Sequence, residues 1–124
     1  MALGWHVLAE FKSCSKVIID SVVEVEKHLN IAAELAGATI VKSVFHQFSP
    51  QGVSGVVVIE ESHFAIHTWP ENAYAAVDLF TCSKDMYFEK ALDYLKTKFE
   101  SEDCEWKMIE RGVGISPEKN YLSK

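Results

Sequence analysis

A chain of 124 residues that is 48% hydrophobic and 24% charged has the size and composition of one folded soluble domain, which we expect to cover residues 1–124. The net charge of −6 argues against nucleic acids and anionic membrane surfaces as partners, because both attract basic faces. The same acidic balance is compatible with a cationic small-molecule substrate.

Three cysteines, Cys14, Cys82 and Cys104, show neither CxxC pairing nor zinc-finger spacing. The opening residues MALGWHVLAEF are too short for a secretory or membrane segment, and His6 and Glu10 make them too polar. An odd number of cysteines without a signal peptide is typical of free thiols in a reducing compartment. We therefore expect a cytoplasmic protein.

Residues 4–12 alternate with period two and predict a first strand. Apolar residues then recur at helical spacing over 16–36, with Ser15 as N-cap and Gly37 at the C-cap, so one amphipathic helix is expected there. Residues 38–48 predict a second strand in strict alternation, followed by a turn at Ser49-Pro50-Gln51-Gly52.

The remaining elements are three strands with short connections, a second helix and a last strand, at 53–60, 63–68, 74–81, 85–99 and 104–111. This order predicts a two-layer α/β sandwich, with a mostly antiparallel sheet and two helices on one face. The other face then needs cover from a second copy of the chain or forms a wet functional cleft. The tail after Gly114 is expected to be loose.

Potentially reactive side chains gather between Gly52 and Cys82, on short and stiff predicted strands. His63 and His67 form an HxxxH pair, which invites a metal interpretation. On a strand, however, this spacing separates them by about 13 Å, so we exclude a shared zinc ion. Ser62 lies at the boundary of two strands, where an ordinary turn serine is the common alternative.

The segment GVSGVVVIEESHFAIHTWPE followed by YAAVDLFTC resembles the signature of the prokaryotic S-adenosylmethionine decarboxylases, which make a pyruvoyl cofactor from an internal serine. GWHVLAEF near the start, GATIV and FHQF in the middle and ERG near the end extend the similarity from about Gly4 to Gly112. The motifs occur in the family's order and spacing.

The resemblance implies that the chain cleaves itself between Glu61 and Ser62, giving a β chain, 1–61, and an α chain, 62–124. The hydroxyl of Ser62 would attack the preceding carbonyl, and elimination from the resulting ester followed by hydrolysis would leave a pyruvoyl group. This group, the only implied cofactor, would form a Schiff base with the substrate amine and act as an electron sink.

The resemblance also implies roles for three further residues: His67 would promote the elimination, Ser54 would assist processing, and Cys82 would return a proton during catalysis. An imidazole and a protonated thiol suit these roles near pH 7. Without the family, these residues would read as a hydrogen-bonded core histidine, a strand serine and a buried hydrophobic cysteine.

Phe48 and Glu71 match family positions that contact the nucleoside, by stacking on adenine and accepting from ribose hydroxyls. A core aromatic and a solvated turn acid are their ordinary alternatives. Two residues depart from the family pattern: Ser83 replaces a usual glycine, and Glu60 replaces a small polar residue. Neither departure removes a reacting group.

The resemblance predicts decarboxylation of S-adenosylmethionine for spermidine synthesis, by a homodimer of processed chains. Arginine or ornithine decarboxylation by the same pyruvoyl chemistry is one alternative, and a non-catalytic binding module is another. If residues 62–67 are extended, His67 lies about 16 Å from Ser62 of its own chain. We therefore expect His67 and Ser54 of one protomer to serve Ser62 and Cys82 of the other.

Overall fold

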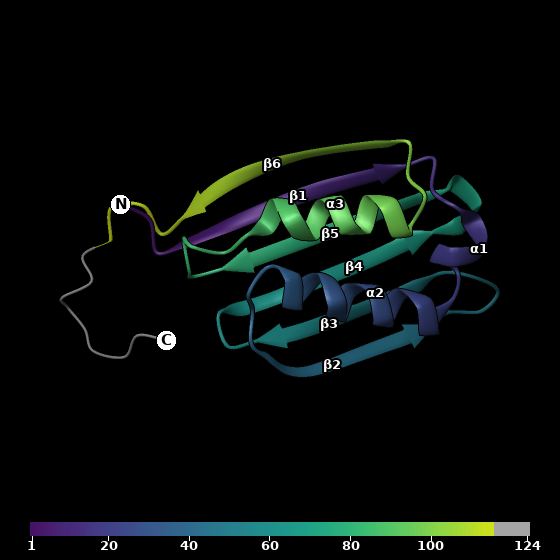
Figure 1. Cartoon of the computed structure of the whole chain (residues 1–124), viewed down its shortest axis with the longest axis horizontal. Helices are drawn as coiled ribbons and strands as arrows, with labels where there is room; N and C mark the ends of the chain where they lie inside the picture. Colours follow the sequence, from purple (N-terminus) through teal and green to yellow (C-terminus); the bar gives the residue numbers. More distant parts are fainter. Residues whose placement is uncertain (116–124) are drawn as a thin grey trace.

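Six antiparallel strands form one sheet in the order β2-β3-β4-β5-β1-β6 in the computed structural model, which describes residues 1–115 (Figure 1). The neighbours β3, β4 and β5 follow one another in the chain through short connections, as hairpins do. The strands are β1 (Gly4–Lys12), β2 (Ile40–Gln47), β3 (Val53–Ile59), β4 (Ser62–Trp69), β5 (Tyr74–Thr81) and β6 (Asp103–Arg111).

The helices α2 (Val22–Leu35) and α3 (Phe88–Lys98) lie side by side on one face of this sheet (Figure 1). Apolar side chains from that face and from the helices form the core, and the edge of the Phe11 ring packs on Phe99. Burial of this apolar area drives the two layers together. The predicted two-layer sandwich is confirmed. Its largest buried side chains include Phe11, Phe64, Phe99, Ile19, Leu29, Ile66, Leu79 and Leu95.

The prediction of one continuous helix over 16–36 was wrong. The chain forms a single turn, α1 (Lys16–Ile19), and restarts as α2, so three α-helices replace the two expected in the described residues. Ser15 caps α1 as predicted, by accepting from the amide of Ile18. Ser21 then starts α2 by accepting from the amide of Glu24 at 3.2 Å, and this second cap breaks the helix.

The break between α1 and α2 also fastens the turn that precedes β3. The carboxylate of Asp20 accepts hydrogen bonds from the amide of Gly52 at 2.8 Å and from the side chain of Gln47 at 3.2 Å. The side-chain oxygen of Gln47 in turn accepts from the amide of Val22 at 3.1 Å. The helix start and the turn therefore hold each other in place.

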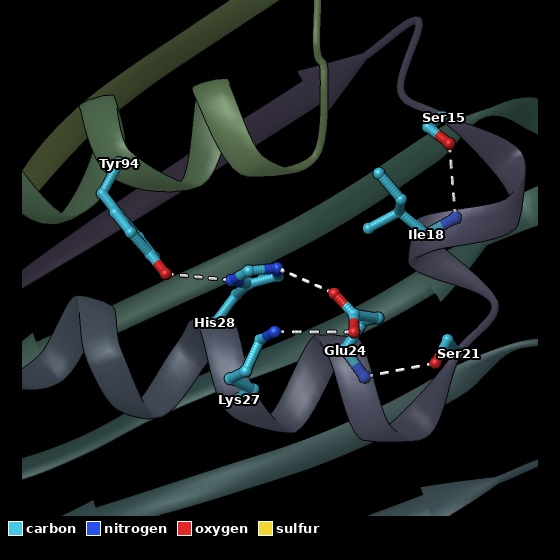
Figure 2. Close-up of polar contacts among 7 residues, drawn as sticks. All are labelled: Ser15, Ile18, Ser21, Glu24, Lys27, His28 and Tyr94. Atoms are coloured by element: carbon cyan, nitrogen blue, oxygen red, sulfur yellow. Dashed lines mark hydrogen bonds and ion pairs between the residues drawn. The ribbon is translucent and has the colours of Figure 1, made fainter.

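A buried histidine joins the two long helices (Figure 2). Nδ1 of His28 lies 2.9 Å from the hydroxyl of Tyr94 on α3, and Nε2 lies 3.1 Å from a carboxylate oxygen of Glu24. The same carboxylate pairs with Lys27 at 3.6 Å. Burial lowers the pKa of His28, and the neighbouring Glu24 opposes this shift only in part.

The strict alternation predicted for 38–48 fails at the start of β2. Ile40 pairs with Ile59, but the next pair joins Lys42 to Val58, so β2 contains one extra residue at this point. As a result Ile40 packs against the core together with Phe45, although the alternation had placed them on opposite faces.

Residues 116–124 lie outside the described part of the chain, and most of the predicted loose tail falls there. Across residues 1–115, none of the helices has the length and apolar character needed to cross a membrane.

Candidate active site

The face of the sheet without helices carries Ser54 and His67, whereas Ser62 pairs with Ile59 and Thr81, which are buried toward the helices. Strand register decides which of them meet. Ser54 on β3 lies opposite His67 on β4, and His67 lies opposite Ala76 on β5. Because side chains alternate between the two faces of a strand, these positions share the open face.

Ser54 and His67 form a direct pair. The hydroxyl oxygen of Ser54 lies 2.8 Å from Nδ1 of His67, a normal hydrogen-bond distance. This contact orients the imidazole and leaves its Nε2 directed to other partners. His67 is exposed on the open face, so the ring can act on a group that approaches from outside its own chain.

A shallow pocket of about 270 Å³ opens beside this pair. Phe48 is 47% exposed there, and the edge of its ring contacts the ring of His46. Glu71 lies in a short 3-10 turn, η1 (Pro70–Asn72), that follows β4. The pocket thus combines an exposed aromatic ring with an exposed carboxylate. Its lining consists of Phe48, Gln51, Gly52, Ser54, His67, Thr68, Trp69 and Glu71.

Glu61 and Ser62 lie in the tight hairpin between β3 and β4. Ile59 pairs with Ser62, so only Glu60 and Glu61 form the connection. Two-residue hairpins normally require positive φ within the turn, but here the positive φ, 152°, falls on Ser62. This region of backbone space is nearly restricted to glycine, so Ser62 holds conformational strain.

The carbonyl of Glu61 is already hydrogen-bonded by the next strand. Its oxygen accepts from the amide of Cys82 at 2.9 Å. The side chain of Glu61 meanwhile accepts from the amide of Thr39 at 3.2 Å, which fixes the other side of the turn. The carbonyl of Glu61 is therefore polarised, and the strained N–Cα torsion of Ser62 follows it directly.

Within one chain these residues form two separate groups. The pocket group is Phe48, Ser54, His67 and Glu71, and the hairpin group is Glu61, Ser62 and Cys82. His67 lies five positions after Ser62 along extended β4. At the rise of a strand this is about 16 Å, which is too far for direct proton transfer.

The family model for S-adenosylmethionine decarboxylase matches residues 5–112. The chain belongs to this family. A relative from Thermosipho melanesiensis, named S-adenosylmethionine decarboxylase proenzyme, is 56% identical over 82% of this chain and 78% of its own length. A protein of the same name from Moorella thermoacetica is 54% identical over 94% of each chain. The crystal structure of the adenosylmethionine decarboxylase from Aquifex aeolicus VF5 matches with a TM-score of 0.83 and 35% identity over 98% of both chains.

The sequence prediction assigned no role to a cluster of aromatic and polar residues beside Cys82. Phe80 lies on the same face of the sheet as Cys82, with the ring of His6 at 5.3 Å and that of His63 at 5.7 Å. Arg111 lies over the Phe80 ring, 5.6 Å from its centre. Period-two alternation could have placed each residue on one face of its strand, but only the strand order brings them together.

A second group missed by the sequence lies next to the pocket. Trp69 stacks on Tyr74 with ring centres 5.3 Å apart, and the Tyr74 hydroxyl donates to Glu10. Burial, helped by the Glu10 carboxylate, raises the pKa of Tyr74 to about 12. Tyr74 therefore stays a neutral hydrogen-bond donor that holds Trp69 beside the pocket.

The two departures from the family pattern are accommodated by local hydrogen bonds. The amide of Ser83 donates to the hydroxyl of Thr81 at 2.9 Å, which tightens the backbone beside Cys82. The amide of Glu60 donates to the carbonyl of Thr39 at 2.9 Å while its side chain is exposed. Ser83 and Glu60 therefore leave the hydrogen bond between Glu61 and Cys82 in place.

His63 and His67 both lie on β4, opposite Val58 and Ser54 of β3. No group of three or more histidine, cysteine or acidic residues within 1–115 is arranged to hold a metal ion. Of the other thiols, Cys14 is buried, and this burial raises its pKa to about 11. That thiol stays protonated and unreactive near neutral pH.

Proposed function

We propose that this chain is the precursor of a pyruvoyl-dependent S-adenosylmethionine decarboxylase that cleaves itself between Glu61 and Ser62. The observation that carries this proposal is the hairpin itself. A serine with φ of 152° follows a carbonyl that already accepts a hydrogen bond from Cys82. Membership of the family, whose named relatives are proenzymes, supports the same conclusion.

Processing would begin when the hydroxyl of Ser62 attacks the carbonyl carbon of Glu61. The acyl group moves from nitrogen to oxygen, so an ester replaces the peptide bond and the strain at Ser62 is released. The amide of Cys82 stabilises the negative charge that develops on the Glu61 oxygen, as an oxyanion-hole donor does.

Elimination then removes a proton from the α-carbon of residue 62 and releases Glu61 as a carboxylate. The resulting dehydroalanine reacts with water and loses ammonia to give the pyruvoyl group. A base is needed for the elimination, and the imidazole of His67, oriented by Ser54 at 2.8 Å, suits this role.

Within one chain, however, His67 lies too far from Ser62 to act. We place the active site between two protomers, each of which contributes the pocket group to the hairpin group of its partner. The open face of the sheet supports this arrangement, because Ser54, His67 and Cys82 lie along it and the helices leave it uncovered (Figure 1).

The substrate nucleoside would lie in the pocket, with adenine against the exposed ring of Phe48 and the ribose hydroxyls donating to Glu71. The pyruvoyl group supplies the electron sink for loss of carbon dioxide. Cys82, exposed beside the new N-terminus of the α chain, returns the proton. The product would serve as the aminopropyl donor for spermidine in the cytoplasm.

Arginine or ornithine decarboxylation is less well supported. Neither substrate carries a nucleoside, so neither has use for the exposed Phe48 and Glu71 of the pocket. A binding module would have no need of a strained Ser62 in the hairpin.

Two measurements test the proposal. Intact mass under denaturing conditions should give two fragments, 1–61 and 62–124, with a blocked N-terminus on the second. The processed protein should release carbon dioxide from carboxyl-labelled S-adenosylmethionine and not from arginine or ornithine. A Ser62→Ala chain should stay whole and inactive, and cleavage of that variant at the same bond would refute the assignment.

A further inference from the structure

Arg111, at the end of β6, reaches across the neighbouring strand toward the strand that leads to Cys82. β1 separates β6 from β5, and Arg111 pairs with Gly4 of β1. Its guanidinium carbon nevertheless lies 5.6 Å from the centre of the Phe80 ring on β5. The missing side chain of Gly4 makes room, because a Cβ there would lie 2.8 Å from the Phe80 ring.

His6 holds the guanidinium in this position. Nη1 of Arg111 lies 3.3 Å from Nδ1 of His6, and since arginine can only donate, Nδ1 is the acceptor. The proton of the neutral imidazole is then on Nε2. Nε2 is shielded from solvent and has no hydrogen-bond partner within residues 1–115. A buried hydrogen-bond donor without a partner lowers the stability of the fold. The His6 ring keeps this orientation nevertheless, and in it Nδ1 makes the hydrogen bond with Arg111.

The guanidinium is a cation on the face of the sheet that Cys82 shares. Phe80 precedes Cys82 by two residues on the same face, and the amide of Cys82 binds the carbonyl of Glu61. No carboxylate within residues 1–115 forms an ion pair with Arg111, whose side chain is exposed. A fixed, exposed guanidinium is suited to bind an anion through two parallel hydrogen bonds.

We propose that Arg111 binds the α-carboxylate of the substrate and that His6 is its positioning residue. This inference rests on the proposed function. The amino-acid end of S-adenosylmethionine must reach residue 62, and the guanidinium lies over Phe80, two residues before Cys82 of the hairpin group. The contact exists for the substrate and disappears when the carboxylate leaves as carbon dioxide. Arg111 therefore distinguishes substrate from product and favours product release.

The test uses the full-length Ser62→Ala chain, which cannot form the pyruvoyl group and so cannot turn over a bound ligand. Calorimetry measures the affinities for S-adenosylmethionine and for its decarboxylated product. Adding Arg111→Ala should weaken binding of the substrate about tenfold or more and leave binding of the product within about twofold. Lys107→Ala is the matched control, because Lys107 has the same charge on the same strand and face, and it should change neither affinity.

Variants of His6 separate positioning from general structure. His6→Asn retains an acceptor near the place of Nδ1 and should keep the preference for substrate, whereas His6→Phe should lose it. In processed enzyme, Arg111→Ala should raise KM more than it lowers kcat. Equal losses for substrate and product, or no loss for either, would overturn the role of Arg111. Failure of the processed wild-type enzyme to release carbon dioxide from S-adenosylmethionine would overturn the proposed function itself.

Discussion

The amide of Cys82 donates a 2.9 Å hydrogen bond to the carbonyl oxygen of Glu61, the oxygen on which charge would develop in the proposed processing. Cys82 thus has two separable functions in the proposed mechanism. Its backbone stabilises the intermediate of self-cleavage, and its thiol returns a proton in each turnover. Substitutions can remove one function and leave the other.

Cys82→Ala keeps the amide and should process at close to the normal rate, but it should lose turnover or transaminate the pyruvoyl group. Cys82→Pro removes the N–H and should slow processing by roughly a hundredfold, the usual cost of one oxyanion donor. Appearance of the two fragments by mass spectrometry gives both rates, and circular dichroism checks the fold. Equal processing by the alanine and proline variants would exclude the backbone role.

The proposed site between two protomers predicts complementation between two inactive chains. Ser62→Ala and His67→Ala should each stay whole when expressed alone. Co-expressed with different affinity tags and purified as a heterodimer, they contain one site with both wild-type residues, and the chain carrying Ser62 should be cleaved there. The control is a heterodimer of one wild-type chain and one chain that carries both substitutions. If the base acts within its own chain, the wild-type chain of this control contains one complete site. No cleavage in the first heterodimer combined with cleavage of the wild-type chain in the second would place the base within its own chain.

The carboxylate of Asp20 should control substrate binding from outside the pocket. Asp20→Ala removes the acceptor for Gly52 and Gln47, so the turn before β3 loosens and Phe48 loses its fixed position. We expect KM to rise several-fold with kcat nearly unchanged, and stability to fall by about 1 kcal/mol per lost hydrogen bond. Asp20→Asn keeps one oxygen acceptor and serves as the control. A drop in kcat at constant KM in Asp20→Ala would contradict this role.

The buried contact of His28 with Tyr94 and Glu24 predicts a pH-dependent stability (Figure 2). Folding lowers the pKa of His28, chiefly through burial, so the unfolded chain binds this proton more readily. The contribution of His28 is therefore complete above the unfolded pKa of about 6.5 and is lost as the pH falls through that value toward the lower folded pKa.

Urea midpoints between pH 8 and pH 5 measure this effect. His28→Gln should flatten the decrease on the acid side, whereas His46→Gln, which changes an exposed histidine, should leave it unchanged. Tyr94→Phe should lower the free energy of unfolding by about 1 kcal/mol at pH 8, where His28 is neutral. The same pH profile for wild type and His28→Gln would rule out His28 as the titrating group.

Local patterns in the sequence were enough to predict the layers. Period-two alternation and short apolar runs located the six strands within residues 1–115, and helical spacing located the two helices that cover the sheet. The sequence patterns did not predict the helix break at Ser21 or the extra residue near Ile40, because each depends on contacts with distant segments. At the helix break, the side chain of Gln47 accepts a hydrogen bond from the amide of Val22. At the extra residue in β2, Ile40 packs against the core. Helical periodicity does not report where a competing cap interrupts a helix.

The family motifs identified Ser62, His67 and Cys82, and their roles remain predictions for the experiments above. Sequence alone could not decide which residues meet, because strand order and register are long-range properties of the folded sheet. Only the tertiary structure shows that Ser54 contacts His67 and that the amide of Cys82 binds the carbonyl of Glu61. It also shows that the guanidinium of Arg111 extends past Gly4 to the ring of Phe80. Arg111 and His6, which are 105 positions apart in the chain, became neighbours because antiparallel pairing placed β1 between β5 and β6.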